Sequence, residues 1–571
     1  MKCFWFQASM ACLLLVSEVC IGQDAPGCAD AEAVQQSIDT ERLREIEELA
    51  KAWLDFMVKI QSPSGALPRN VTVEPGTGEV VSSAREVRND DLCQSLGKDF
   101  LWGYRIWRDE RYLRAAVRLA DFFVKAQHPQ GGWAGFYSLQ PDGSFTTAEP
   151  GGLVRFEEYV QSNCVRHLAA VYYLTGDEKY KRAAMKGGEV ILYAQDPSGW
   201  WPFAAVSGAG GDPREGYMKG PTLNDWALNA CVGDCLVLYH MTGDRRYLDA
   251  ICKAGEWLIS AQLEDPTPGW ADQYDLQGNP AWARPMEPPA VGLYFGTDGA
   301  EVLLMLYDVT GNERYLQPLR KHLAWLQSIP KEKKGWIWYA HRSWSAEENR
   351  GRVTDYSREM AERYGAKLPS EQTLAGVAIE AGEPIVAHHY QMVPVDHPEV
   401  QRYLKPLNGH YVSRAPGVEN WLARELQQRS EGPIMPSFRG SVPARLFFSD
   451  RARARPTPAG CTALYDPDGS LARNVSLLEP WRSGQPDVAP SGMRPLRVAE
   501  GGTHRVPVDY GSQVMSMVLR QIALANVALR RASAGIIPLY TYSLYECGDI
   551  SIVDPTCDWY AVDLDRRKEQ Q

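Results

Sequence analysis

Three carboxylates recur at equivalent positions in the chain, each lying 19 residues before a short repeated turn phrase. They are Asp90, Glu158 and Asp225. Equivalent positions of a repeat are expected at the same end of successive elements, so these side chains should lie on one rim of the fold. Like charges that share a site repel each other unless a cation or a proton offsets them. The pattern therefore indicates a shared functional site, with helix capping by Asp as the structural alternative.

Two of these carboxylates share a local motif. Asp90 and Asp225 each follow an asparagine, in N-D-D-L, which also contains Asp91, and in N-D-W-A. Lys219 stands shortly before the second motif and is a candidate contact for the carboxylate of a substrate. A solvated lysine on the protein surface is the alternative interpretation of Lys219.

An unusual loop, residues 269–290, is the second candidate for chemistry. It places Arg284 and Glu287 among prolines and the indole rings of Trp270 and Trp282. Tryptophan rings on an exposed loop present flat apolar faces on which sugars stack, and an arginine fixed by prolines can bind a carboxylate through two parallel hydrogen bonds. We therefore expect this loop to bind an acidic sugar. A rigid surface loop with an Arg–Glu ion pair is the structural alternative.

Two recurring phrases predict the elements that position these residues. The first, typified by T-G-D-R-R-Y-L, is centred on Asp109, Asp177, Asp244 and Asn312, at spacings of 68, 67 and 68 residues. The second, a Gln followed by Gly-Trp, comes after each of these and a stretch with helical spacing of apolar residues. Two markers with one period predict a repeat of helical hairpins, in which Gly ends one helix and Asp or Asn caps the next.

The predicted fold class is all-α, an α/α toroid of helical hairpins with a period of about 67–68 residues. A superhelical array is the alternative, but the long loops rich in Trp and Gly favour a toroid with a site on its rim. The hairpins and a preceding helix at roughly 40–61 form a catalytic domain, 40–337. The period fails over 338–571, where we expect an irregular region that packs on the toroid, or else an independent domain.

Composition and the first residues restrict the class of protein. The formal net charge of −11 over 571 residues argues against a nucleic-acid-binding protein. Residues 1–22 have the pattern of a secretory signal, which predicts a secreted or periplasmic protein, and no later stretch is apolar enough for a membrane span. Nine cysteines remain after that segment, and Cys547 and Cys557 are the best candidates for a disulfide. The sequence does not indicate an oligomeric state.

Residues 85–315 resemble polysaccharide lyase family 10, the pectate lyases of the α/α toroid type. The resemblance is carried by N-D-D-L, Q-H-P-Q-G-G-W-A-G-F-Y, Q-D-P-S-G-W-W-P-F, T-L-N-D-W-A and W-A-D-Q-Y-D followed by P-A-W-A-R-P-M-E-P-P. It implies that Arg284 is the base that abstracts a proton. It also implies that Asp225, with Asp90 or Asp91, helps to bind Ca²⁺ and substrate. The second Asn-Asp motif departs from the family in carrying Trp226 where another Asp often stands.

The implied reaction explains why such residues are needed. In β-elimination the weakly acidic C5 hydrogen of a uronate is removed, so the adjacent carboxylate must be neutralised, and an oxygen-ligated Ca²⁺ would do this. Arginine is intrinsically a poor base because its pKa stays above about 12. The role of Arg284 as a base therefore rests on the resemblance, whereas a role as carboxylate clamp or enolate stabiliser rests on ordinary electrostatics.

The sequence thus predicts a secreted lyase that cleaves a pectate-like, uronate-containing polymer by calcium-assisted β-elimination. The first alternative is a glycoside hydrolase on the same scaffold, with Asp90, Glu158 and Asp225 as the candidate acid and base. The second alternative is a glycan-binding protein without catalytic activity, in which the Trp-rich rim binds sugar.

Overall fold

The structure of the protein is a computed structural model. The structure describes residues 40–74, 79–89, 96–147, 149, 152–206, 214, 216–264, 268–281, 283, 290–292, 296–328, 337–340, 384–388, 391–393, 414–432, 504–508, 519 and 522. The predicted signal segment, 1–22, and the predicted disulfide cysteines, Cys547 and Cys557, lie outside these residues. Among the described helices, none is both long and apolar enough to cross a membrane.

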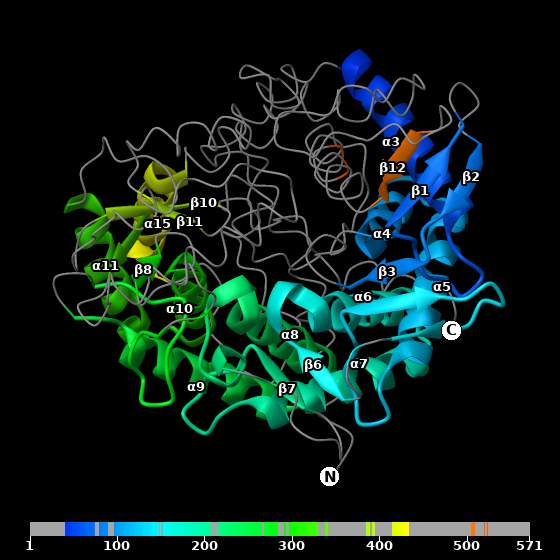
Figure 1. The fold of residues 1–571 in the computed structure, drawn as a ribbon. Coiled ribbons are helices and arrows are strands. Elements are labelled where there is room, and N and C mark those ends of the chain that lie inside the picture. The colour runs from blue at the N-terminus through cyan, green and yellow to red at the C-terminus, as the bar shows by residue number, and fades with distance from the viewer. Residues whose placement is uncertain are drawn as a thin grey trace, which may run out of the picture.

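Four helical hairpins follow one another along the chain, after a first helix, α3 (Thr40–Ile60). The pairs are α4 (Leu96–Trp107) with α5 (Glu110–Ala126), α6 (Val160–Thr175) with α7 (Glu178–Ala194), α8 (Ala227–Thr242) with α9 (Arg245–Ala261), and α10 (Gly296–Thr310) with α11 (Leu316–Ser328). Figure 1 shows them as an arc with α4, α6, α8 and α10 on the inside and their partners outside. The predicted fold class, an α/α toroid of helical hairpins, is confirmed.

The inner and outer helices differ in the way they are buried. The outer helix α5 buries one stripe of residues that includes Tyr112, Leu119 and Phe123, and it exposes charged side chains on the other face. This is the apolar spacing of a helix packed on one side. The inner helix α6 is instead buried along nearly its whole length, from Val160 to Leu174. The inner helices therefore form the core of the arc, and the outer helices cover it.

The T-G-D and T-G-N phrases form the turns within the hairpins. The N-cap residues are Asp109, Asp177, Asp244 and Asn312. Each side chain accepts a hydrogen bond, at 2.9 to 3.2 Å, from the backbone N–H two residues further along the chain. Gly176 and Gly243 end the preceding helices in the left-handed conformation, with φ of 71° and 70°. The predicted capping role of the phrase is confirmed.

The second phrase joins each outer helix to the next. Gln195, which follows α7, donates a hydrogen bond from Nε2 to the carbonyl oxygen of Ala250 on α9 at 2.8 Å. Gln127 and Gln262 make equivalent bonds to the outer helices α7 and α11. Gly199 has a φ of 108°, and a Cβ atom there would lie 2.1 Å from the carbonyl oxygen of Lys253. The period in the sequence is therefore the period of the contacts between hairpins.

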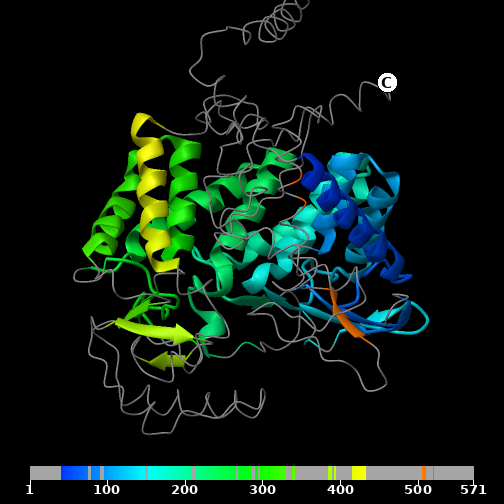
Figure 2. The same ribbon diagram turned by 90° about the horizontal axis from the view of Figure 1, so that it is seen from above.

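Short antiparallel strands lie between the hairpins and were not predicted. In the described part of the chain they form four sheets. The first has the strand order β12 (His504–Pro507)–β1 (Asn70–Val73)–β2 (Val80–Ser83), and the second β3 (Glu86–Arg88)–β4 (Phe136–Leu139)–β5 (Phe145–Thr146). The third is β6 (Leu153–Arg155)–β7 (Ala204–Val206), and the fourth is β11 (Gln391–Val393)–β10 (Pro384–His388)–β9 (Ile337–Ala340)–β8 (Ala290–Gly292). Strands β3, β6 and β8 come directly before α4, α6 and α10. In Figure 2 the strands lie along one edge of the helices. We call this edge, where the inner helices begin, the strand rim.

Described segments of the C-terminal region contact the hairpins. Strand β12 pairs with β1, with Val506 opposite Val71. Helix α15 (Arg414–Gln428) packs on the last hairpin and is followed by the short helix η6 (Arg429–Glu431). The buried guanidinium of Arg429 donates hydrogen bonds to Asp308 on α10, at 2.9 Å, and to Glu425 on α15. Arg429 thereby ties this segment to the last hairpin, while the division at residue 337 stays a prediction.

Candidate functional site on the strand rim

The inner helices α6 and α8 begin with the same kinked turn. Short 3₁₀ segments, η2 (Glu157–Tyr159) and η4 (Asn224–Trp226), precede the two helices. The last two residues of each segment have left-handed backbone angles, with φ between 48° and 60°. A non-glycine residue in this conformation costs about 1–2 kcal/mol, and such strain is concentrated at functional sites. The repeated strain marks these two turns as candidates for function.

The two turns lie against each other. The rings of Tyr159 and Trp226 are stacked, with centroids 5.6 Å apart and planes inclined by 25°. These two residues are also the N-cap residues of α6 and α8, and neither makes a side-chain capping hydrogen bond. Glu158 and Asp225 each stand one residue before the N-cap. The structure therefore does not give these two acidic residues the position that the capping alternative requires.

Asp225 and Glu157 are the buried acidic residues of this pair of turns, with exposed fractions of 5% each. Burial raises the pKa of Glu157 to about 8; the charge of Arg155 opposes this shift, and the charge of Asp225 adds to it. The atom Oε2 of Glu157 has no hydrogen-bond partner among the described residues. Two carboxylates of adjacent hairpins thus interact in a largely dry environment, which a bound cation or a proton on Glu157 would relieve.

Glu157 was missed by the sequence reasoning, which selected its neighbour Glu158. Glu158 is only partly buried. The signal was present in the repeat: Glu157 occupies the position of Asn89 in the first unit and Asn224 in the third. It therefore stands where the first residue of the Asn-Asp motif is expected, and only this unit has an acid there.

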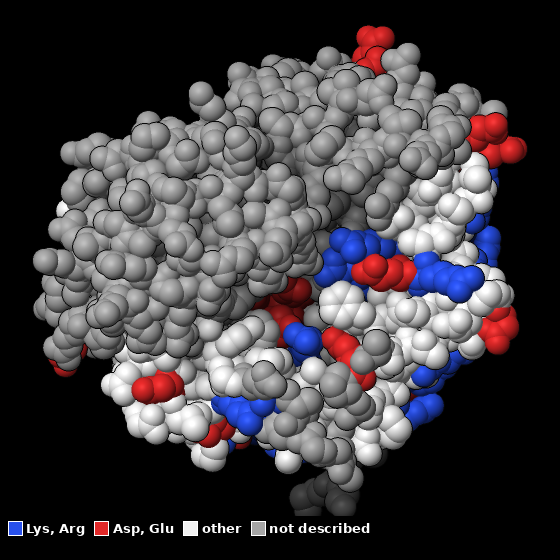
Figure 3. All heavy atoms as spheres, viewed as in Figure 1, with Lys and Arg blue, Asp and Glu red and all other residues white. Residues whose placement is uncertain are grey.

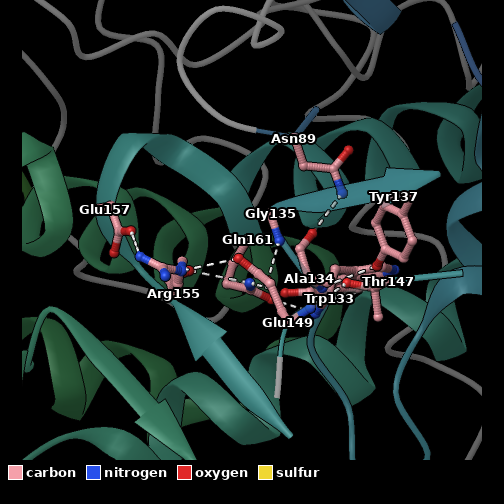
Figure 4. A network of polar contacts seen from close by, with 10 residues as sticks. All are labelled: Asn89, Trp133, Ala134, Gly135, Tyr137, Thr147, Glu149, Arg155, Glu157 and Gln161. Atoms are coloured by element: carbon pink, nitrogen blue, oxygen red, sulfur yellow. Dashed lines mark hydrogen bonds and ion pairs between the residues drawn. The ribbon is translucent and has the colours of Figure 1, made fainter. Parts of the chain in front are cut away.

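Arg155, at the end of β6, joins Glu157 to the preceding loop (Figure 4). Its Nη1 donates a hydrogen bond to Glu157 Oε1 at 2.8 Å, and its Nε donates to Glu149 Oε1 at 3.0 Å. Burial lowers the pKa of Arg155, but the charges and hydrogen bonds of Glu157 and Glu149 outweigh it, so that the pKa lies above its ordinary value. Arg155 is therefore a permanent cation shared by two carboxylates.

The same network holds Asn89, the residue before Asp90. The Nδ2 atom of Asn89 donates to the carbonyl oxygen of Ala134 at 3.1 Å, and its backbone N–H donates to Gly135 at 2.8 Å. Asn163 on α6 donates from its side chain to the carbonyl oxygen of Asn89 at 2.8 Å. The backbone that leads into the first predicted acidic motif is thus fixed to the second hairpin.

The other predicted site residues are placed as follows. Lys219 ends a short 3₁₀ helix, η3 (Gly216–Lys219), on the strand rim and is exposed. The remaining five predicted site residues lie outside the described residues: Asp90, Asp91, Trp282, Arg284 and Glu287. Of the predicted metal ligands, the structure therefore places only Asp225, and it adds Glu157 beside it.

Trp270 is a core residue, and its predicted role in stacking on sugar is wrong. Its exposed fraction is 0%, and its indole N–H donates to the carbonyl oxygen of Leu258 at 2.8 Å. Trp133 and Trp201 make the same bond to the outer helices α5 and α7. A ring enclosed in this way offers no face to a ligand. The repeated tryptophan anchors the loop after each outer helix.

A complete metal site is not formed by the described part of the chain. In that part, no group of three or more His, Cys, Asp or Glu side chains could hold a metal ion. On the face shown in Figure 3, acidic side chains lie in a hollow with basic side chains beside them. The described carboxylates Glu157 and Asp225 thus match the oxygen ligands that Ca²⁺ prefers, but they fit only part of its usual set of six to eight.

Comparisons with known proteins find distant similarity to solved structures. No protein-family model matches the sequence, and no curated protein matches it. A mutant family 10 polysaccharide lyase from Cellvibrio cellulosa, in complex with trigalacturonic acid, is 18% identical, with 41% of this chain and 72% of that chain covered and a TM-score of 0.31. A family 76 glycoside hydrolase from a bovine Bacteroides thetaiotaomicron strain is 11% identical, with 85% and 78% covered and a TM-score of 0.42. For a cellobiose 2-epimerase from Bacillus thermoamylovorans, the identity is 10%, the coverage 57% and 83%, and the TM-score 0.38.

All of these neighbours are described as enzymes that act on carbohydrates, and they comprise three different reaction types. At these identities and TM-scores, the similarity does not show the activity of this chain. A fold of this kind accommodates unrelated reactions, so the activity must be argued from the residues of the site.

Proposed function

We propose that the protein is a carbohydrate-active enzyme that cleaves a uronate-containing, pectate-like polysaccharide by calcium-assisted β-elimination. The supporting observation is the pair of buried carboxylates, Glu157 and Asp225, at the starts of adjacent inner helices. Asp225 lies in the Asn-Asp motif through which the sequence resembles family 10 lyases, and Glu157 occupies the equivalent position of the second unit to the Asn of that motif. The proposal includes export from the cytoplasm, in line with the pattern of residues 1–22.

The charge balance of the described cluster favours a cation. Arg155 provides one positive charge, which it shares between Glu149 and Glu157, while Asp225 adds a further negative charge nearby. Glu157 and Asp225 are both buried, and when both are ionised they repel each other in a dry environment, where Coulomb interactions are strong. A hard divalent cation between them would offset this repulsion. When bound, it would also neutralise the uronate carboxylate and so acidify the adjacent C–H bond.

The chemical step is assigned to the predicted loop residues. Arg284 is the candidate base, or else the clamp that holds the substrate carboxylate while another group takes the proton. Glu287, Trp282 and Lys219 are the candidate contacts to the sugar chain. Within the described residues, Glu157 and Asp225 bind the cation and Arg155 holds Glu157 in place.

A glycoside hydrolase is the second candidate, because of one specific observation. A carboxyl group with a pKa of about 8 is protonated at neutral pH, and this is the state required of a general acid. Glu157 would then protonate the leaving oxygen, and Asp225 would act as the base or nucleophile. The two candidates make opposite demands on Glu157, since cation binding requires its ionised form.

The products of the reaction distinguish the two candidates. The purified full-length protein is incubated with polygalacturonate, with calcium or with a chelator, and both ultraviolet absorbance and reducing ends are followed. We expect a calcium-dependent rise in absorbance from the unsaturated uronide, strongly reduced in Glu157→Gln and Asp225→Asn. Glu313→Gln, an exposed acid at the opposite end of the hairpins, is the matched control. Reducing ends without absorbance would indicate hydrolysis, and no absorbance on pectate or related uronans would exclude the lyase.

The role of Arg284 has its own test. Arg284→Lys keeps the positive charge but loses the planar geometry of the guanidinium. We expect turnover to be abolished while oligogalacturonate binding, measured by calorimetry, is retained. Full activity of this variant would remove Arg284 from the chemistry.

A further inference from the structure

We infer that Arg155 and Glu149 form a positioning unit, which fixes the carboxyl group of Glu157 relative to the loop that holds Asn89. Neither residue is part of the predicted motifs. The catalytic readout of the inference rests on the proposed function, whereas the geometry on which it is built does not.

The first part of the unit is the geometry of Arg155. Its guanidinium is planar, and Nε and Nη1 lie on different edges of that plane. One edge contacts Glu149 and the other contacts Glu157, so the angle between the two carboxylates is fixed by the arginine itself. Both carboxylates are largely buried, with side-chain exposures of 9% and 7%. The contacts are therefore partly desolvated, unlike the exposed ion pairs that contribute little to stability.

The second part is the attachment of Glu149 to the neighbouring loop. The backbone N–H of Gly135 donates to Glu149 Oε2 at 2.8 Å, so this carboxylate uses its other oxygen for a main-chain contact. The carbonyl oxygen of Gly135 accepts the backbone N–H of Asn89. A continuous chain of hydrogen bonds thus runs from Asn89 through Gly135, Glu149 and Arg155 to Glu157. This chain of hydrogen bonds joins the residue that precedes the first acidic motif, Asn89, to the turn at the start of the second hairpin.

Separate contacts hold the backbone of the same region, so the unit is not needed for folding of the rim. Gln161 on α6 donates to the carbonyl oxygens of Trp133 and Arg155, at 2.8 and 3.2 Å, and accepts the backbone N–H of Trp133 at 2.9 Å. Asn163 holds Asn89. Loss of the Arg155 side chain therefore leaves the backbone contacts in place and changes mainly the position of the carboxylates.

The test uses Arg155→Gln, Glu149→Gln and Arg155→Lys in the full chain. Arg182→Gln, an exposed arginine of the outer helix α7, is the matched control. Because small displacements of a catalytic group cost up to about 100-fold in rate, we expect at least about a tenfold loss in kcat for the first two variants. KM for polygalacturonate should change less than about threefold. Arg155→Lys keeps the positive charge but lacks the two fixed edges of the guanidinium, so its kcat should lie between those of Arg155→Gln and the wild type.

Two further measurements separate positioning from a general loss of stability. In a Glu157→Gln background, Arg155→Gln should cost less than about a further twofold in kcat, because the group it positions is already absent. Hydrogen exchange of the Gly135 amide, followed in a peptide that covers residues 133–137, should accelerate at least about fivefold in Arg155→Gln, since the carboxylate that accepts its hydrogen bond is released. Independent losses in the double variant, or an unchanged kcat in Arg155→Gln, would overturn the inference.

Failure of the proposed function gives a different result. If the wild-type protein releases no unsaturated product, the lyase proposal fails, and the exchange experiment alone decides the positioning unit. Faster exchange in residues 133–137 then supports the unit, and unchanged exchange overturns it.

Discussion

Replacement of Glu157 by Gln should change how the stability of the protein depends on pH. The ordinary pKa of this carboxyl group is 4.5, and burial raises it to about 8 in the folded protein. Between these two values the folded state binds a proton that the unfolded state does not. The free energy of unfolding must therefore fall as the pH rises, by about 1.36 kcal/mol per pH unit, until the folded group also loses its proton.

Two buried histidines determine the pH range in which this effect is clearest. Burial lowers the pKa of His167 and His322 to about 4, from an ordinary value of 6.5. Both therefore stabilise the folded state increasingly as the pH rises to 6.5, which opposes the effect of Glu157. Above pH 6.5 they contribute no further change. Between pH 6.5 and 8, the ionisation of Glu157 should lower the stability by about 1.5 to 2 kcal/mol.

Urea unfolding at several pH values from 6.5 to 8, in the presence of a chelator, measures this difference. The free energies of wild type and Glu157→Gln should diverge by about 1.5 to 2 kcal/mol in favour of the variant, because Gln cannot ionise. Comparison of the two proteins cancels groups that they share, and Glu313→Gln should run parallel to wild type. Parallel curves for wild type and Glu157→Gln would show that Glu157 titrates normally, and the reasoning from its burial would be refuted.

Three further predictions concern the frame of the site and are checked by urea unfolding at constant pH. Gly199→Ala should lower the free energy of unfolding by about 3 kcal/mol, because Gly199 has a left-handed φ and lies very close to α9. Gly278 has a φ of 83° but open space around it, so Gly278→Ala should cost only about 1 kcal/mol. Equal losses in the two variants would contradict the close approach of Gly199 to α9. Asp244→Ala should cost about 1 kcal/mol through loss of the helix cap, and no loss would contradict that role. Arg429→Ala should cost about 3–5 kcal/mol because Asp308 is left buried and charged, and a loss below about 1 kcal/mol would show that α15 is not held by this pair.

Much of the fold could be predicted because the same structural contacts recur in successive units of the repeat. The N-cap side chains, the Gln that bonds to the next outer helix and the turn glycines recur with one period, and each has a single physical explanation. The short strands could not be predicted, because they are only two to five residues long and lie in loops without regular alternation. Their pairing depends on which loops meet on the strand rim, which is a property of the assembled arc.

The candidate site was predictable in its location but not in its details. The spacing of Asp90 and Asp225 identified the starts of the inner helices. It could not show that the left-handed turns bury Glu157 and leave Glu158 partly exposed, because the sequence contains no signal for that backbone conformation. The error at Trp270 has a different cause: tryptophan was interpreted from its chemistry, although its recurrence in each unit already indicated a structural contact.

The repeat provides a rule for separating structure from function in this chain. A position that carries the same residue type and makes the same bond in successive units is explained by the contact between hairpins, as for Gln195 and Trp201. A position whose residue differs between two units that share the same backbone turn, as the second and third units do, requires another explanation. Glu157 is such a position, because at the same spacing the other units carry Asn89, Asn224 and Gly292, none of which is acidic. An amide there would avoid the unfavourable burial of a carboxyl group beside Asp225. Retention of an acid at that cost is therefore the strongest physical argument that the second turn of the strand rim binds a cation or transfers a proton.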